Sequence, residues 1–115
     1  MQLGIIILAG KGRQGRAWES PPGNLYASTI IRISVSDPAP ASLAFVAALA
    51  AFDTVTDAAP DIPVQIKWPN DILTADGAKL CGILLERAND AIIAGFGINL
   101  FNHPLLPDRP TADLS

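Results

Sequence analysis

The sequence predicts an α+β domain, in which a largely antiparallel mixed sheet carries a helix on one face. Four short β-type segments follow one another after residue 60, and the connections between them are too short for anything but antiparallel pairing. An alanine-rich stretch with helical spacing precedes them. The 115 residues suit one domain, and a composition that is 50% hydrophobic and 17% charged is typical of a folded protein.

The first half of the chain predicts two strands around a glycine-rich loop. Residues 4–9 contain three isoleucines in succession and predict a strand that is buried on both faces. Residues 10–23 form the loop. Residues 24–36 alternate apolar with polar or mixed side chains, which predicts a second strand with one apolar face.

A helix is predicted to follow. Asp37 fits the cap position and Pro38 the first turn, and residues 41–58 keep helical spacing up to Pro60. Asp53 and Asp57 mark the expected solvent side. The apolar face expected against the sheet consists of Leu43, Phe45, Val46, Leu49, Ala50, Phe52 and Val55.

The second half predicts strands at residues 64–68, 72–74, 79–86 and 91–97. Asp76 and Gly77 predict a tight turn, and Asn89 with Asp90 predicts a hairpin. We expect Trp68 in the core and Cys81 as a small buried hydrophobic residue within a strand. Residues 102–115 are punctuated by prolines and predict an irregular tail.

Charge and cysteine usage narrow the function classes. The net charge of −3 argues against nucleic acid as a partner, so we expect no DNA binding. Four of the eight Lys and Arg residues nevertheless fall within residues 11–32, which favours a small anionic ligand. Cys81 is the only cysteine, so no intrachain disulfide can form, and we expect a cytoplasmic protein. The apolar run 3–9 is too short to span a membrane, and no membrane partner is expected.

The loop after the first strand contains the pattern G-x-G-x-x-G at Gly10, Gly12 and Gly15. In a dinucleotide-binding fold this pattern opens a helix, and Pro21 with Pro22 prevents a long helix here. Two interpretations stay open on the pattern alone: an anion-binding turn, or an exposed turn with solvated charges. The cations and the aromatic residue of the loop are Lys11, Arg13, Arg16 and Trp18.

Four motifs together resemble biotin–protein ligases. They are G-K-G-R-Q-G-R-A-W-E-S-P-P-G-N-L-Y-A-S at residues 10–28, K-W-P-N-D at 67–71, K-L-C-G-I-L-L-E at 79–86 and G-F-G-I-N-L at 95–100. Their order and spacing are similar to those of the family, and together they cover nearly the whole chain. The resemblance implies the biotin/lipoate ligase type of catalytic domain, which is related to class II synthetases.

The resemblance also implies a reaction. Such ligases join biotin to ATP, which gives biotinyl-5′-AMP and pyrophosphate. They then transfer the biotinyl group to a lysine of a biotin carboxyl carrier protein. Magnesium accompanies the ATP, no metal site built by protein side chains is expected, and no covalent enzyme intermediate is needed.

Site residues carry over from the motifs. Lys79 and Arg13 are the expected catalytic residues, and Asn70 and Asp71 would orient the lysine and the metal-bound nucleotide. Biotin contacts are expected from Lys11, Gly12, Arg13, Lys79 and Gly82. Contacts with ATP or the adenylate are expected from Arg16, Trp18, Asn70, Asp71 and Asn99.

Each of these residues has a plain structural alternative. Lys79 fits an ordinary lysine at a strand end, Asn70 and Asp71 fit a turn, and Asn99 fits a loop cap. His103 is expected to be surface structure and is given no catalytic role.

The sequence departs from the family pattern at three points. Lys11 stands where the family loop usually has arginine, and Ile7 stands about where a glutamine contacts biotin. The third departure is length, because residues 1–115 resemble a partial catalytic domain. By the resemblance we expect the family's biotin-pocket segment before it and small C-terminal domain after it to be absent from this chain.

These departures keep two alternatives open besides the full ligase. One is a catalytically impaired homologue that binds ligand weakly or only associates with a partner. The other is a lipoate-type acyl ligase. A sheet without its flanking elements exposes apolar surface, so self-association as a homodimer is also expected.

Overall fold

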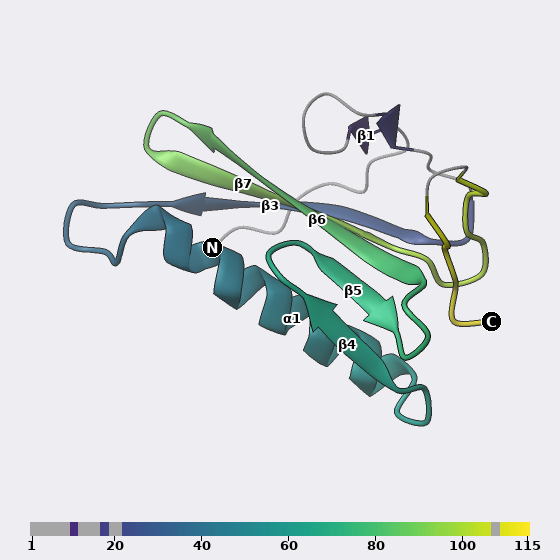
Figure 1. Ribbon diagram of the computed structural model, residues 1–115. Helices are drawn as coiled ribbons and strands as arrows, with labels where there is room; N and C mark the ends of the chain where they lie inside the picture. Colours follow the sequence, from purple (N-terminus) through teal and green to yellow (C-terminus); the bar gives the residue numbers. More distant parts are fainter. Residues whose placement is uncertain (1–9, 12–16, 19–21, 107–108) are drawn as a thin grey trace.

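A five-stranded antiparallel sheet with one α-helix on one face forms the body of the protein (Figure 1). The computed structural model describes residues 10–11, 17–18, 22–106 and 109–115. The strand order is β3-β7-β6-β5-β4, which confirms the predicted fold class. The elements are β3 (Leu25–Arg32), α1 (Leu43–Ala58), β4 (Val64–Lys67), β5 (Asp71–Thr74), β6 (Lys79–Ala88) and β7 (Ala91–Ile98).

Two further short strands flank the glycine-rich loop. β1 (Gly10–Lys11) pairs antiparallel with β2 (Ala17–Trp18), and Gly10 lies opposite Trp18. The element that follows the G-x-G-x-x-G pattern is therefore a strand, which agrees with the rejection of a dinucleotide-binding fold. The strand predicted at residues 4–9 lies outside the described residues.

The strand predicted at residues 24–36 is the shorter β3, because its partner β7 does not extend beyond Arg32. Arg32 of β3 lies opposite Ala91, the first residue of β7, and only one further backbone bond follows, from Ile33 N–H to Asp90 O at 2.8 Å. The chain then turns. The Asp37 carboxylate accepts a hydrogen bond from Ser34 N–H at 2.8 Å.

The predicted helix start was therefore wrong. Asp37 closes the turn with Ser34 instead of capping a helix. A 3-10 turn, Pro40–Ser42, leads into α1, which begins at Leu43 and ends at Ala58, two residues before Pro60. An aspartate whose carboxylate accepts a hydrogen bond three residues back in the chain cannot also accept from the first helical N–H groups.

The face of α1 that packs on the sheet matches the prediction only at Val55 and Phe52. The buried residues are Ala47, Ala48, Ala51 and Val55, whereas Val46 and Leu49 are 59% and 55% exposed. The alanines carry no bulk beyond Cβ, so the helix approaches closely and fills the sheet surface with backbone and methyl groups. Asp53 and Asp57 are exposed, as predicted.

Trp68 was predicted in the core, and this prediction was wrong. It lies just after the edge strand β4, is 49% exposed and stacks on Phe45 with the ring centroids 4.1 Å apart. An edge position gives the indole only one neighbouring layer to pack against.

By length and composition alone, the segment Pro40–Ala58 is apolar enough to cross a membrane. Its alanine face packs against Ile72, Leu80 and Cys81 of the sheet, so we interpret it as the helical layer of this fold.

The second half of the chain follows the prediction closely. Gly77 in the β5–β6 turn and Asn89 in the β6–β7 hairpin both have positive φ, at 90° and 56°. Glycine and asparagine tolerate this conformation better than other residues. Cys81 is fully buried, as predicted.

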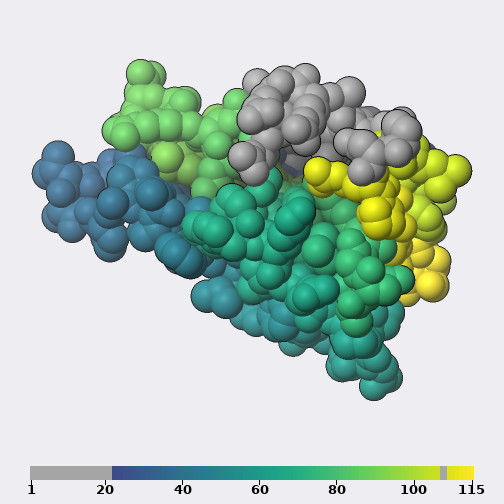
Figure 2. All heavy atoms as spheres, in the orientation of Figure 1, coloured from purple at the N-terminus to yellow at the C-terminus, as the bar shows by residue number. Residues whose placement is uncertain are grey.

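The C-terminal tail is irregular, as predicted, and backbone hydrogen bonds hold it against β6. β7 ends at Ile98, and the tail occupies the position beside β6 that β7 leaves. Lys79 N–H donates to Pro110 O and Ala112 N–H donates to Lys79 O, both at 2.9 Å. In Figure 2 the tail, coloured yellow, packs against the strands at the end of the molecule opposite the blue segment that precedes α1.

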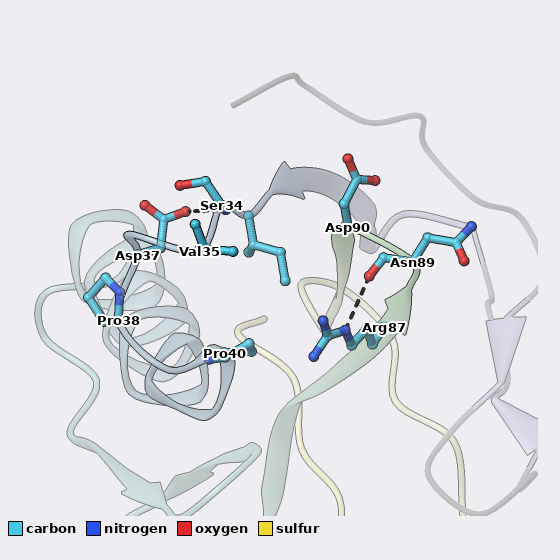
Figure 3. A pocket seen from close by; sticks show the side chains of 9 residues that line it. Ser34, Val35, Asp37, Pro38, Pro40, Arg87, Asn89 and Asp90 are labelled. Carbon is cyan, nitrogen blue, oxygen red and sulfur yellow. Dashed lines mark hydrogen bonds between the residues drawn. The ribbon is translucent and has the colours of Figure 1, made fainter.

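A hollow of 380 Å³ lies at the other end of β6, beside the β6–β7 hairpin (Figure 3). Arg87 lies in its wall and donates from Nε to Asn89 O at 3.2 Å. The complete lining is Ile33, Ser34, Val35, Asp37, Pro38, Pro40, Arg87, Asn89 and Asp90.

Candidate active site

Three charged side chains meet at the starts of β5 and β6, and we call Asp71, Lys79 and Arg109 the Asp71 cluster. Lys79 Nζ lies 3.1 Å from Asp71 Oδ1, and Arg109 Nη1 lies 3.5 Å from Asp71 Oδ2. The side chains of Asp71, Lys79 and Arg109 are 10%, 17% and 31% exposed. Oδ1 accepts no well-aligned hydrogen bond from the described residues, so its contact with Lys79 is Coulombic attraction.

The β5–β6 turn explains how Asp71 and Lys79 meet. Residues 75–77 reverse the chain, so that the start of β6 returns along β5. An irregularity in the register between Ile72 and Leu73 adjusts the pairing beside Lys79. Asn70 anchors the preceding turn, because its carbonyl accepts Ile83 N–H at 2.9 Å. Asn70 is thus a turn residue, whereas Asp71 is the first residue of β5 and contacts the predicted catalytic lysine.

A row across the sheet places two glycines between Asp71 and Tyr26. Asp71 lies opposite Gly82, Gly82 opposite Gly97, and Gly97 opposite Tyr26. Directly opposed residues in antiparallel strands present their side chains to the same face. The neighbouring row of Ile72, Cys81 and Ile98 belongs to the core against α1, so the glycine row lies on the other face. On this face Gly82 leaves the backbone without a side chain beside Asp71.

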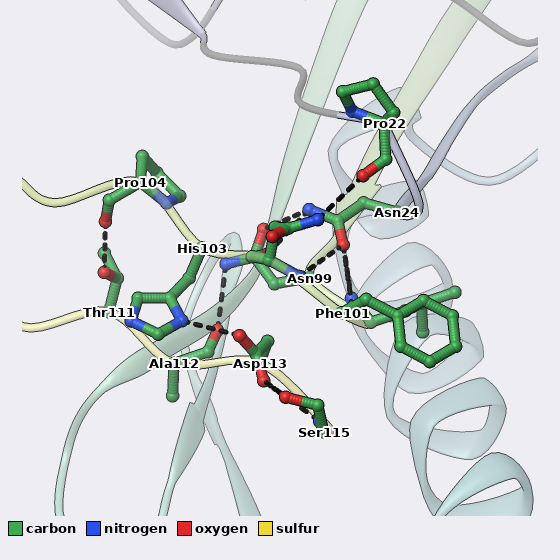
Figure 4. A network of polar contacts seen from close by, with 12 residues as sticks. Pro22, Asn24, Asn99, Phe101, His103, Pro104, Thr111, Ala112, Asp113 and Ser115 are labelled. Carbon is green, nitrogen blue, oxygen red and sulfur yellow. Dashed lines mark hydrogen bonds and ion pairs between the residues drawn. The ribbon is translucent and has the colours of Figure 1, made fainter.

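The Asn24 side chain joins the segment after β7 to the start of β3 through hydrogen bonds (Figure 4). Its Oδ1 accepts the successive N–H groups of residues 100, 101 and 102, at 2.8, 3.0 and 3.1 Å. Its Nδ2 donates to Asn102 O at 2.7 Å and to Tyr26 Oη at 3.1 Å. One side chain therefore satisfies several backbone groups of the loop that carries Asn99.

Asn99 is 4% exposed, and its amide is engaged at both ends. Nδ2 donates to Ala112 O at 3.0 Å, and Oδ1 accepts a long hydrogen bond from Asn24 Nδ2 at 3.5 Å. The residue thereby joins the end of β7 to the tail. This arrangement matches the structural alternative for Asn99, and its predicted contact with adenine stays a prediction.

Burial makes Cys81 unsuitable as a nucleophile. Removal from water raises the pKa of its thiol to about 12, although the Lys79 ammonium acts in the opposite direction. The thiol is therefore neutral at physiological pH and unreactive. Burial also raises the pKa of the Tyr26 hydroxyl, while the hydrogen bond from Asn24 opposes the change.

A profile of the biotin/lipoate A/B protein ligase family matches residues 6–100, which is most of the chain. The chain belongs to this family. Among curated relatives, it is 42% identical over 102 residues to a biotin–[acetyl-CoA-carboxylase] ligase of Paracoccus denitrificans and 40% identical over 98 residues to the bifunctional ligase/repressor BirA of Escherichia coli. These matches cover 84% and 80% of this chain, but only 42% and 30% of the relatives.

Solved structures of biotin protein ligases have the same fold. The Leishmania major enzyme in complex with biotinyl-5-AMP superposes with a TM-score of 0.80 at 29% identity, over 97% of this chain and 51% of that one. The Aquifex aeolicus enzyme in complex with biotin and ATP gives 0.75 at 31% identity, over 91% and 45%. The chain thus spans about half the length of the ligases whose fold it shares.

The family loop is only partly described. Gly12, Arg13 and Arg16 lie outside the described residues, and for Lys11 and Trp18 only the backbone position in β1 and β2 is described. Their predicted contacts with biotin and the adenylate stay predictions. Among the predicted ligase residues, the structure brings Lys79, Asp71 and Gly82 together and places Asn99 beside the tail.

Two site residues had not been singled out from the sequence. Asn24 follows the Pro-Pro-Gly turn immediately before β3, a position that suggests a side chain bonded to backbone. Arg109 lies in the tail and gives no local signal, because its contact with Asp71 depends on how the tail returns to β6.

His103 has a structural role that agrees with the prediction. Its Nδ1 lies 2.7 Å from Asp113 Oδ2, and the Ser115 hydroxyl bonds the other oxygen of the same carboxylate. These bonds lower the pKa of the Asp113 carboxyl, and the bond from Ser115 has the largest effect. The Ser115 hydroxyl bonds the carboxylate and not the imidazole. His103 is therefore not placed to act as a base that activates Ser115 as a nucleophile.

The described residues do not build a magnesium site. No group of three His, Cys, Asp or Glu side chains converges within the described part of the chain. The Asp71 carboxylate, which lies beside Lys79, is already paired with two cations. Magnesium usually binds through substrate phosphates with only one or two protein carboxylates, so we assign no metal ligand here.

The hollow of Figure 3 lies at the opposite end of β6 from Lys79. None of the residues to which the family motifs assign a role lines this hollow. We therefore place the site at the Asp71 cluster, where charge, burial and the family motifs coincide.

Proposed function

We propose that this chain carries the central part of the catalytic domain of a biotin–protein ligase. It would activate biotin with ATP to biotinyl-5′-AMP and pass the biotinyl group to a lysine of a biotin carboxyl carrier protein. The observation that carries the proposal is the half-buried Lys79 ammonium beside Asp71, in a chain that superposes on a biotin protein ligase in complex with biotinyl-5-AMP.

The chemistry needs a cation where two anions meet. A biotin carboxylate oxygen attacks the α-phosphorus of ATP, the bond to the β-phosphate oxygen breaks, and pyrophosphate leaves. Lys79 would hold the carboxylate and the α-phosphate together and stabilise the charge that builds on the phosphoryl oxygens. Arg13 and Lys11 would add charge from the loop. The neutral Cys81 thiol takes no part. The amine of the carrier lysine attacks the biotinyl carbonyl of the adenylate directly, the bond to the phosphate oxygen breaks, and AMP leaves.

The floor of the proposed site is the glycine row. Gly82 and Gly97 carry no side chain on the face beside Asp71, so a flat ligand can lie directly on the sheet backbone. We assign biotin to this floor, with Gly12 and the rest of the loop as its cover.

The nucleotide half of the proposal rests on Asn99, Asn70, Arg16 and Trp18. Asn99 Nδ2 donates one of its two hydrogens to Ala112 O, and we assign the second hydrogen to adenine. Magnesium would arrive with the ATP phosphates.

We extend the proposal to the protein's setting. Its lone cysteine is buried and suits a reducing cytoplasm. Phe45, Val46 and Leu49 expose apolar surface on α1, which supports self-association as a homodimer. Sedimentation of the wild type and of Leu49→Lys tests this: the variant should be monomeric, and identical sedimentation would contradict a dimer through α1. Repressor activity, which the name of the Escherichia coli relative includes, is not part of the proposed function.

Biotin-dependent release of pyrophosphate from ATP tests the proposed function. Folded protein should release pyrophosphate with biotin and not with lipoate as the acid. Activity with lipoate alone would favour the lipoate-type ligase. Absence of release with either acid, combined with heat of biotin binding in calorimetry, would indicate an impaired homologue. Absence of both would exclude ligase activity for this chain.

A further inference from the structure

Arg109 belongs to the Asp71 cluster but to none of the four family motifs. Its Nη1 lies 3.5 Å from Asp71 Oδ2, while Lys79 Nζ lies 3.1 Å from Oδ1. One carboxylate with 10% side-chain exposure therefore contacts two cations, one from β6 and one from the tail.

The tail holds Arg109 at this place through backbone bonds. Pro110 O accepts Lys79 N–H, and Ala112 N–H donates to Lys79 O, so the residues that follow Arg109 are paired with Lys79 itself. Asn99 adds a third bond through Ala112 O. The guanidinium thus comes from a segment that is fixed to the backbone of the proposed catalytic residue.

The charges show what the second cation does. Asp71 and Lys79 alone would form a neutral pair, and an anion that bound Lys79 would compete with the carboxylate for the ammonium. A carboxylate that loses its partner in a buried position is strongly destabilised. With Arg109 on Oδ2, the carboxylate keeps a partner when Lys79 turns to a ligand, and the cluster has a net charge of +1.

We propose that Arg109 is a positioning residue that holds Asp71 and thereby frees the Lys79 ammonium for the anionic oxygens of the substrate. This inference rests on the proposed function, because it assigns Arg109 a part in substrate binding at Lys79. Arg109 acts through Asp71 and does not itself contact the substrate.

Kinetics of pyrophosphate release separate this role from a structural one. In Arg109→Gln, substrate binding must break an unshared Lys79–Asp71 pair, so KM for biotin should rise by about tenfold. The Lys79–Asp71 pair is already broken once substrate is bound, so kcat should stay within about threefold of the wild-type value. Arg109→Lys retains the charge and should recover most of the loss. Arg32→Gln, at an exposed ion pair, is the control and should match the wild type. Unchanged KM in Arg109→Gln, or no recovery in Arg109→Lys, would overturn the proposal.

A double-mutant cycle tests whether Arg109 acts through Asp71. In an Asp71→Asn background the Asp71 carboxylate no longer competes for Lys79, so the addition of Arg109→Gln should change KM by less than about twofold. A full tenfold loss in that background would show direct contact with substrate and would contradict a positioning role.

A measurement without substrate keeps the inference separate from the proposed function. Lys79 can be labelled with an amine-reactive ester and followed by mass spectrometry. Arg109→Gln should slow labelling of Lys79 several-fold, because the ammonium gains an undivided carboxylate and loses a neighbouring cation, and Asp71→Asn should accelerate it. This result would support the inference even if pyrophosphate release were absent from the wild type. Equal labelling rates in all three proteins would overturn it.

Discussion

The protein contains two ion pairs of the same kind at opposite ends of its sheet, and they differ in burial. Arg32 and Asp90 meet at the hairpin end, at 3.4 Å, with side chains that are 82% and 67% exposed. Lys79 and Asp71 meet at the tail end, at 3.1 Å, with side chains that are 17% and 10% exposed. The pair at the hairpin end is open to solvent, whereas the pair at the tail end is shielded and shares its carboxylate with Arg109 from the tail.

The difference in burial decides what each pair can do. An exposed pair is screened by solvent and contributes little to stability. In a partly buried pair, each charge depends on the other, and a displaced partner must be replaced. We therefore place function at the tail end and regard the hairpin end as scaffold.

Replacement of Asp71 and of Asp90, each in a separate variant, should give the largest difference in stability between the two ends. Asp71→Ala leaves Lys79 and Arg109 facing each other without a carboxylate, and we expect the free energy of unfolding to fall by about 2 kcal/mol. That figure is below the usual range for buried pairs, because both cations retain some contact with water. Asp90→Ala should change it by less than about 0.5 kcal/mol. Urea titration of both variants measures the values, and equal losses would remove the distinction between the two ends.

Side chains that accept backbone N–H groups offer a second contrast. Asn24→Ala deprives three successive N–H groups of their acceptor and should cost about 1–2 kcal/mol. Asn24→Asp keeps the acceptor and should recover part of the loss. Asp37→Ala removes one exposed bond to Ser34 N–H and should cost about 0.5 kcal/mol. A larger loss for Asp37→Ala than for Asn24→Ala in thermal unfolding would contradict this order.

Reaction of the Cys81 thiol with a labelling reagent should be the smallest of these effects in the folded protein. With a pKa of about 12, only about one thiol in 10,000 is ionised at pH 8, so a thiol reagent should react only after unfolding in urea. Because the pKa is raised in the folded state, the thiol favours folding below pH 9, and this contribution is lost as the pH rises from about 9 towards 12. Rapid labelling at pH 8 without denaturant would show that the tail end is open to solvent.

The elements that sequence patterns predicted well depend on local interactions. The β6–β7 hairpin follows from Asn89 and Asp90, and the β5–β6 turn follows from Asp76 and Gly77, because the turn residues themselves set the backbone conformation. The face of α1 was predicted less well. Alanine and larger apolar residues both recur at helical spacing, and only the shape of the sheet decides which set it buries.

The site shows the same division. Lys79 and Asp71 were singled out through family motifs and lie on neighbouring strands joined by one turn. Asn24 bonds residues that are 76 to 78 positions away, and Arg109 reaches Asp71 only because the tail returns to β6. Such contacts depend on the whole topology, and no local pattern of residues predicts them.

Pyrophosphate release by Lys79→Gln, compared with Arg87→Gln, tests the central claim most directly. Lys79 lies at the tail end, and Arg87 lies at the hairpin end of the same strand. Loss of the ammonium should lower biotin-dependent release by at least about 100-fold, because it stabilises charge that builds in the transition state. Arg87→Gln should retain wild-type activity within about twofold. Wild-type activity in Lys79→Gln, or an equal loss in both variants, would contradict the assignment of function to the tail end.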